Sequence, residues 1–467
     1  MTPRPTKTPQ GRPRRPPSVL RVFGPVGAMA ILTYMAEYAS FVVVLAFISN
    51  KFTVTFQLGT FGYFFVGIVS SGFLITSGLV AIVMGHLSDK YGRKKMTIVG
   101  CLLGSVALIS LIVGDSATRL APFAVATGIS LIGLGLAHGT YTSSTLAYGG
   151  DLAGRNKMMG KAYGIVDGAE FAGFAFGPAL GTTVLLLTKS STTVFELSAF
   201  LMLIAAAVAV IAMPEIRTVA VMPEHHEEEH DAHEVKEEVK GEVAEPEAMH
   251  PHSHSASWGD YVDAFRTPIV GVALLTTLVG AVGFAAFFYY VPVYAHTLGT
   301  CVLPPLRATC TPRVPIFGSL WGYFASIMAV TGVGFMVPFG HYEDRHTRRM
   351  PYLVVGLIGA AGALALVFFT ATLVSFLAAA IAFGLAIGVV RVSQLVILAE
   401  ASKPSNRATV MGTNHAMEHV GYGVASLVTG SLIAFLGGFE SAFRVLALVL
   451  IVSGVLFLLY ARSKNVR

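Results

Sequence analysis

Long apolar runs separated by short polar segments dominate this chain. Of its 467 residues, 54% are hydrophobic and only 12% are charged, whereas about a quarter of the residues in soluble domains are charged. Twelve runs are long enough for a helix to cross a bilayer. They cover residues 22–48, 61–84, 96–114, 120–148, 158–187, 194–213, 268–295, 316–339, 352–370, 373–399, 408–436 and 440–461. We therefore expect an all-α membrane protein with twelve transmembrane helices.

The basic residues indicate how these helices are oriented. An even number of spans places both termini on one side of the membrane, and most Lys and Arg residues fall on that side. Basic loops mark the cytoplasmic side, so the pattern predicts a multi-pass protein of the plasma membrane with both termini in the cytoplasm. The net charge of +6 follows from this topology, and we expect no nucleic-acid binding. The residues that depart from the pattern are Lys51, Arg119, Lys189, Arg307 and Arg313 outside, and Arg391 and Arg444 within spans.

Residues 214–263 differ sharply in composition from the rest. They hold more than half of the 26 acidic residues and half of the 14 histidines. Such a segment cannot bury enough apolar surface to fold alone. We predict a basic cytoplasmic segment (1–21), a six-helix bundle (22–213), an acidic His-rich cytoplasmic linker (214–263), a second six-helix bundle (264–461) and a cytoplasmic tail (462–467).

Metal binding is the functional alternative for the linker. Its clustered imidazoles could hold zinc or nickel loosely, or change charge near pH 6.5. A solvated linker is the preferred interpretation, and we expect no cofactor and no other metal site. The weak candidate ligands are His225, His226, His230, His252 and His254.

Two of the three cysteines, Cys301 and Cys310, share one Pro-rich loop. Their spacing is not that of a metal site. A disulfide would close the loop if it faces an oxidising exterior, and two free thiols are the alternative.

A motif after the second span recurs at the same place in the second half. Residues 85–95 read Gly-His-Leu-Ser-Asp-Lys-Tyr-Gly-Arg-Lys-Lys, and residues 340–349 read Gly-His-Tyr-Glu-Asp-Arg-His-Thr-Arg-Arg. A duplicated half in a membrane protein predicts two pseudo-symmetric bundles around a central site that opens alternately to each side. We therefore expect a secondary active transporter with a small-molecule substrate.

The motif at 85–95 resembles the loop signature of the major facilitator superfamily, and this resemblance covers nearly the whole chain. In that family Gly85 would let helices approach closely, Gly92 would permit a tight turn, and Arg93 would offer a fork to a carboxylate. The resemblance implies two cytoplasmic gating latches that stabilise the outward-open state. They are Asp89–Arg93–Asp151 and Asp344–Arg348–Glu400. Alternatively, these basic residues only anchor the topology.

The span at 158–187 contains a second motif, made of Gly173, Gly177, Pro178 and Gly181. It resembles the Gly-x-x-x-Gly-Pro-x-x-Gly signature of the superfamily's drug:proton antiporters. Glycines four residues apart allow close helix packing, and proline bends a helix. The span at 120–148 lacks the early arginine that these antiporters usually carry.

Ionisable residues within spans are the candidates for proton coupling, because a charge there is expensive and usually functional. The resemblance implies that the first, fourth, seventh and tenth spans line the cavity, so Glu37, His138 and Arg391 should converge. Glu37 is our first candidate for the proton carrier, and a permanent Glu37–Arg391 ion pair is the alternative. Tyr34, Tyr38, Tyr141, Tyr290 and Gln394 complete the predicted cavity. Asp167, Glu170, His415, Glu418 and His419 are second-tier candidates.

These observations favour proton-coupled export of small amphipathic organic compounds. Aromatic residues in the seventh span, Phe284, Phe287, Phe288, Tyr289, Tyr290 and Tyr294, would supply an apolar binding wall. The closest alternative is a proton symporter importing a sugar or organic acid, because Arg391 could bind a carboxylate. A metal exporter or sensor is a remote alternative. The sequence has no P-loop and no evident catalytic pair, so we expect neither ATP-driven transport nor an enzyme, and we expect a monomer in the lipid bilayer.

Overall fold

The computed structural model describes residues 19–115, 118–156, 159–214, 268–300, 320, 322–343, 350–369, 372–401 and 407–463. Within these ranges the chain forms helices and no strand. The first half contains α1 (Val19–Asn50), α2 (Gly62–Tyr91), α3 (Arg93–Asp115), α4 (Leu120–Asn156), α5 (Met159–Thr188) and α6 (Ser191–Ala212), with short π and 3-10 turns η1 (Lys51–Thr55) and η2 (Gly59–Phe61). The second contains α8 (Pro268–Ala285), η3 (Ala286–Tyr290), α9 (Val291–Thr300), α11 (Tyr323–Glu343), α12 (Met350–Phe369), α13 (Leu373–Ala401), α14 (Arg407–Phe435) and α15 (Phe439–Ser463).

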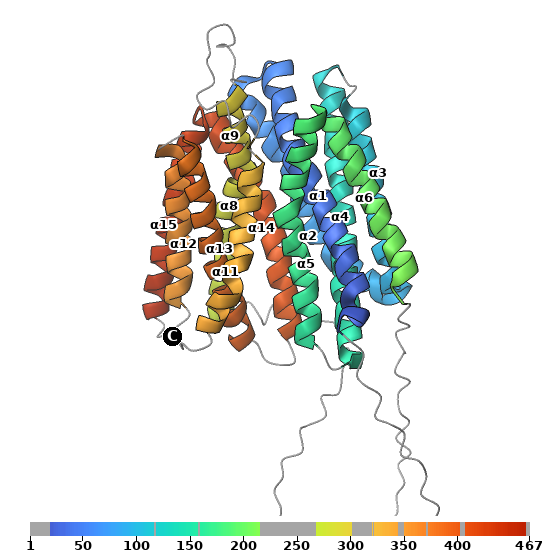
Figure 1. The fold of residues 1–467 in the computed structure, drawn as a ribbon. Coiled ribbons are helices and arrows are strands. Elements are labelled where there is room, and N and C mark those ends of the chain that lie inside the picture. Colours follow the sequence, from blue (N-terminus) through green and yellow to red (C-terminus); the bar gives the residue numbers. More distant parts are fainter. Residues whose placement is uncertain are drawn as a thin grey trace, which may run out of the picture.

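Each of the twelve predicted spans coincides with a helix. The seventh span is built from α8, the π-helical turn η3 and α9 in direct succession. Among the described residues, 11 helices are long and apolar enough to cross a membrane, and α14 is the helix that falls short. It carries Asn414, His415, Glu418 and His419, yet it runs along the bundle beside α2 and α8 (Figure 1). The all-α membrane fold predicted from the sequence is therefore confirmed.

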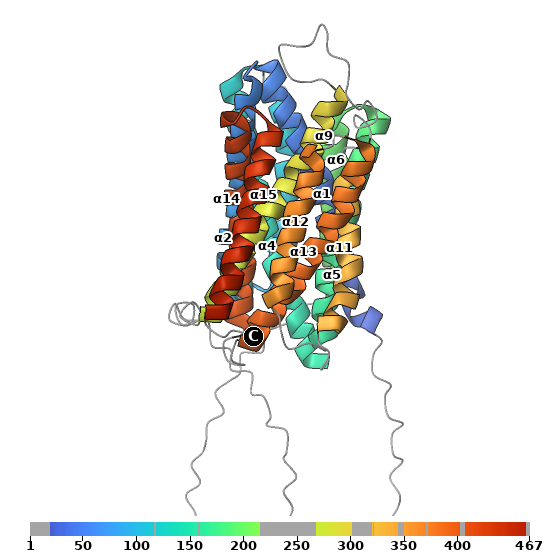
Figure 2. The same cartoon turned by 90° about the vertical axis from the view of Figure 1, so that its left-hand side faces the viewer.

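The two halves pack their helices in the same pattern. In the first half α1 packs on α5, α2 on α4, and α3 on α6. In the second half the corresponding contacts join α8 to α14, α11 to α13, and α12 to α15. Repetition of the same contacts by helices in the same chain order shows two pseudo-symmetric six-helix bundles. Figures 1 and 2 show them side by side, with their helices roughly parallel.

The halves meet along two helix pairs, α2 with α14 and α5 with α11. Toward the end of the bundle remote from the last residue of α15 (Figure 1), side-chain hydrogen bonds link both pairs. Ser70 Oγ lies 2.6 Å from Ser426 Oγ, and Thr183 Oγ1 lies 2.7 Å from the hydroxyl of Tyr323. Both helix pairs are therefore held together by hydrogen bonds across the interface at this end.

Candidate transport site

A buried acid–base cluster joins α1 to α4. Glu37 is 0% exposed and His138 is 1% exposed. Nδ1 of His138 lies 2.7 Å from Oε2 of Glu37, and the hydroxyl of Tyr141 donates to the same oxygen. His138 and Tyr141 are three residues apart, so they lie on one face of α4. The cluster can hold a proton on either the carboxyl or the imidazole without exposing a charge to lipid.

Aromatic side chains pack around this cluster. Tyr34 donates from its hydroxyl to Thr142 Oγ1 at 3.1 Å, and its ring meets the ring of His138 edge-on at 5.8 Å. Tyr38 stacks on Phe174 of α5 with ring centroids 3.7 Å apart. These two tyrosines belong to the packed core around Glu37, where they shield the cluster from solvent.

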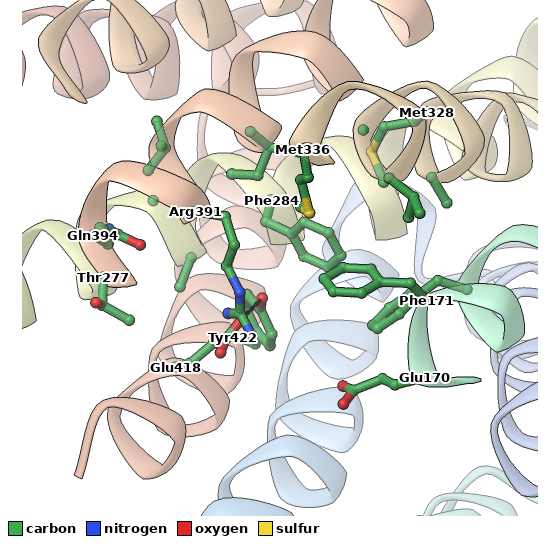
Figure 3. A pocket seen from close by; sticks show the side chains of 18 of the residues that line it. Glu170, Phe171, Thr277, Phe284, Met328, Met336, Arg391, Gln394, Glu418 and Tyr422 are labelled. Atoms are coloured by element: carbon green, nitrogen blue, oxygen red, sulfur yellow. Dashed lines mark hydrogen bonds and ion pairs between the residues drawn. The ribbon is translucent and has the colours of Figure 1, made fainter. Parts of the chain in front are cut away.

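A cavity lies next to this cluster, between α5 of the first half and α8, α11, α13 and α14 of the second. Most of its lining is apolar. The ring of Phe174 contacts those of both Phe171 and Phe284, and Figure 3 shows Phe284 between Arg391 and Phe171, with Glu170 below Phe171. The other principal lining residues are Phe174, Met328, Met336 and Tyr422, with the polar groups of Thr277, Gln394, Glu418 and His419.

Within the cavity, Arg391 of α13 pairs with Glu418 of α14. The hydroxyl of Tyr422 also donates to Glu418. Because Arg391 and Glu418 belong to adjacent helices of one half, they meet without any contact across the interface. The Glu37–Arg391 pair considered from the sequence does not form in this structure, since each residue has a partner in its own half.

The glycine motif of α5 packs against α1, the helix that carries Glu37. A Cβ atom at Gly177 would lie 2.8 Å from Cβ of Tyr38. At Gly173 it would overlap Tyr34, and at Gly181 it would overlap the backbone of Ala39. Pro178 lies inside α5, within this contact. The three glycines therefore set the distance between α5 and α1 beside the buried cluster.

Two further predicted cavity residues lie in different places. Tyr290 donates from its hydroxyl to the carbonyl of Ser426 at 2.8 Å, which places it beside the Ser70–Ser426 contact between α2 and α14. Gln394 lines the cavity, and its Nε2 donates to Thr276 Oγ1 at 3.3 Å. Gln394 is thus available to a ligand, while Tyr290 ties η3 to α14.

The loop motif forms a sharp turn between α2 and α3. Gly92 has φ +98°, a conformation that favours glycine, and its N–H donates to the carbonyl of Ser88 at 3.0 Å. Arg93 Nη1 donates to Ser88 Oγ at 3.3 Å. Among the described residues, a Cβ atom at Gly85 would meet no other atom within 4 Å, and no close approach is seen there.

Several predicted residues cannot be placed. The side chains of Asp89, Asp151, Asp167 and Glu400 lie among those that the structure does not describe. Asp344, Arg348, Cys301, Cys310 and the linker histidines lie outside the described residues altogether. The latches, the disulfide and metal binding by the linker therefore stay predictions. Among the residues that the structure does describe, no group of three or more His, Cys, Asp or Glu side chains could hold a metal ion.

Paired bundles with a cavity between them are typical of membrane transporters. The family model for the Major Facilitator Superfamily matches residues 26–308 and 314–467. The chain belongs to this superfamily and is a transporter, not an enzyme.

Solved structures of other transporters share the fold. A point mutant of the nucleoside transporter NupG is similar with a TM-score of 0.71 and 12% identity, over 94% of this chain and 99% of that one. The unmutated NupG structure gives a TM-score of 0.68 and 13% identity, over 94% of this chain and 98% of that one. The human organic anion transporter MFSD10 (TETRAN) gives 0.59 and 16% identity, over 94% of this chain and 100% of that one. No curated protein sequence matches the chain significantly.

Proposed function

We propose that this transporter is proton-coupled and exports small amphipathic organic compounds across the plasma membrane, with both termini in the cytoplasm. The observation that carries the proposal is the cluster of Glu37, His138 and Tyr141. An ionisable carboxyl that is 0% exposed inside a membrane helix is energetically expensive, and such residues usually take part in ion or proton movement.

Gain or loss of one proton at this cluster changes the charge between α1 and α4. With the proton shared between Glu37 and His138, the pair is neutral overall. Loss of this proton leaves the pair with a net negative charge in an apolar setting, where an unpaired charge is strongly disfavoured. The protonation state therefore biases the equilibrium between outward-facing and inward-facing conformations, and a ligand such as a proton can drive the cycle only through such a bias.

The cavity supports an amphipathic substrate. Aromatic side chains such as Phe171 and Phe284 offer apolar surface, while Thr277 and Gln394 offer hydrogen bonds, a combination typical of small-molecule sites. The one arginine of the described lining is already paired with Glu418. The charge of Arg391 is thus balanced before any substrate arrives, which favours uncharged or amphipathic compounds over obligate anions.

Export is supported by the glycine–proline motif of α5, which resembles that of drug:proton antiporters and packs directly on α1. Proton-coupled import of a sugar or organic acid is the second candidate. Arg391 supports it, because a substrate carboxylate that displaced Glu418 would find a guanidinium in the cavity. The names of the structural neighbours add nucleosides and organic anions to the compounds worth testing.

Proteoliposomes with an imposed pH gradient test the proposal. Amphipathic dyes, carboxylates, sugars and nucleosides are screened for movement driven by the gradient. Antiport predicts that an amphipathic compound moves against the direction of proton flow. Movement of a sugar or carboxylate together with protons would instead establish the symport alternative.

Glu37→Gln supplies the decisive variant because it mimics the protonated carboxyl. Gradient-driven transport should be lost, while exchange of labelled for unlabelled substrate, which needs no net proton movement, should persist. Glu440→Gln is the control, since Glu440 lies on α15 with a side chain 43% exposed. A stable Glu37→Gln protein that still couples transport to the pH gradient would refute the carrier role.

A further inference from the structure

Three histidine rings lie in a row that extends from the buried cluster to the other half of the protein. The ring centroid of His138 on α4 lies 4.9 Å from that of His419 on α14. His419 in turn lies 4.5 Å from His415, one helical turn away. The contact is possible because α14 approaches α2 closely at Gly78, where an added Cβ atom would lie 3.0 Å from Cβ of His419.

Residues of this row and the neighbouring Glu37 also carry buried polar atoms without hydrogen-bond partners. Oε1 of Glu37, Nε2 of His138 and Nδ1 of His419 are buried and have no hydrogen-bond partner among the described residues. Buried polar groups in folded proteins nearly always have one. Glu37 contacts His138, and His138 contacts His419, so the three atoms belong to residues that touch one another.

His419 is also the member of this group that reaches the cavity. It lines the cavity together with Glu418 and Arg391, whereas Glu37 and His138 do not. It is 5% exposed, so it touches the cavity while its ring remains inside the protein. The only imidazole in contact with His138 within the described part of the chain therefore stands between the cavity and the proposed proton carrier.

We propose that His419 relays protons between the cavity and the Glu37–His138 pair. This inference rests on the proposed function and names the route by which the carrier is loaded and unloaded. A neutral imidazole has one N–H donor and one bare acceptor nitrogen. His419 accepts a proton from the cavity on its bare nitrogen and gives its other proton to Nε2 of His138. His138 then transfers its Nδ1 proton to Oε2 of Glu37. One proton leaves the cavity, one arrives at Glu37, and both imidazoles end neutral with their tautomers exchanged.

The charged groups around the relay suit this role. Arg391 faces His419 from α13, but Glu418 balances its charge. Glu37 lies at the far end of the route and accepts the proton. Further titratable neighbours are Tyr34 and Tyr38 on α1, Tyr141 on α4, Glu170 on α5, Tyr289 on η3, and His415 and Tyr422 on α14.

A pH-jump infrared measurement on the purified protein in lipid vesicles tests the relay without any substrate. Protonation of Glu37 appears as a carboxylic C=O band, identified by its absence in Glu37→Gln. His419→Gln should leave the final amplitude of this band unchanged and slow its appearance by about a hundredfold or more, the lower end of the range for removal of a proton-transferring group. His296→Gln, which changes a histidine of α9 outside this group, should leave the rate unchanged.

The outcomes separate the relay from the proposed function. No titrating Glu37 band in the wild-type protein at any pH would overturn the carrier role itself. A titrating band with an unchanged rate in His419→Gln would overturn the relay alone. His419→Asn, with a smaller amide, replaces the glutamine variant if that protein does not fold. If neither folds, the wild-type rate is measured in D2O, and a rate that does not fall there overturns proton transfer along this route.

Discussion

Breaking the buried ion pair of the cavity should destabilise the protein unequally, depending on which partner is removed. Arg391 and Glu418 are in contact, and their side chains are 23% and 10% exposed. Removing one partner of a buried pair leaves an uncompensated charge and typically costs about 3–5 kcal/mol. Glu418→Gln should reach this range, because the guanidinium left behind cannot lose its proton.

Arg391→Gln leaves a carboxyl instead, and a carboxyl can take up a proton. The destabilisation of this variant should therefore shrink as the pH is lowered, by at most about 1.4 kcal/mol per pH unit. That of Glu418→Gln should not shrink in this way. The double variant Arg391→Gln/Glu418→Gln has no orphaned charge, so it should be more stable than the Glu418→Gln single variant.

Thermal unfolding of the purified proteins in detergent at several pH values measures these differences. Arg444→Gln is the matched control, because Arg444 lies 4.0 Å from Glu440 in an exposed pair on α15, with side chains 60% and 43% exposed. Such a pair contributes at most about 1 kcal/mol. The buried-pair reasoning fails if Glu418→Gln has the same melting temperature as Arg444→Gln, or if the double variant is the least stable of all.

Three further outcomes follow from the structure and the sequence. Gly177→Ala should push α5 away from Tyr38 and impair transport or lower the melting temperature by a few degrees. Gly168→Ala in the same helix is the control, because nothing described lies within 4 Å of its new Cβ, and it should change neither property. Equal behaviour of the two variants would contradict the packing argument. Asp89→Asn should slow transport at unchanged expression if the latch exists, and normal transport would favour a topology anchor. Deletion of residues 224–254 should leave transport and metal tolerance intact, and a large loss of zinc resistance would establish a metal role for the linker.

The sequence predicted the helices well because hydropathy is a local property. Each apolar run needs only its own length and composition to be recognised as a span. Even α14, which falls short on composition, was identified, because the apolar residues around its polar ones fill the rest of the span. The duplicated loop motif likewise indicated two similar halves, since a repeat can be read directly along the chain.

Which buried charged residues pair with each other could not be predicted in the same way. Glu37 and Arg391 were each recognised as costly inside a span, but the sequence does not say which helices cross at their depth. The packing of α13 and α14 gives Arg391 the nearby Glu418, which had ranked only as a second-tier candidate. The meeting of His138 with His419 depends on the approach of α14 to α2, a distance between halves that no local pattern encodes.

The two halves carry different ionisable groups on corresponding helices. The helices α5 and α14 correspond to each other in the two halves, and each carries one glutamate that lines the cavity, Glu170 and Glu418. The helices equivalent to each other, α4 and α13, carry different bases in their spans, His138 and Arg391. A guanidinium stays charged throughout the cycle, while an imidazole changes charge near neutral pH. We therefore expect the second half to hold a fixed ion pair at the cavity, and the first half to hold the pair whose charge changes during transport. A duplication that kept both bases alike would lose this difference, which is why proton coupling in this chain is expected to reside with Glu37 and not with Glu418.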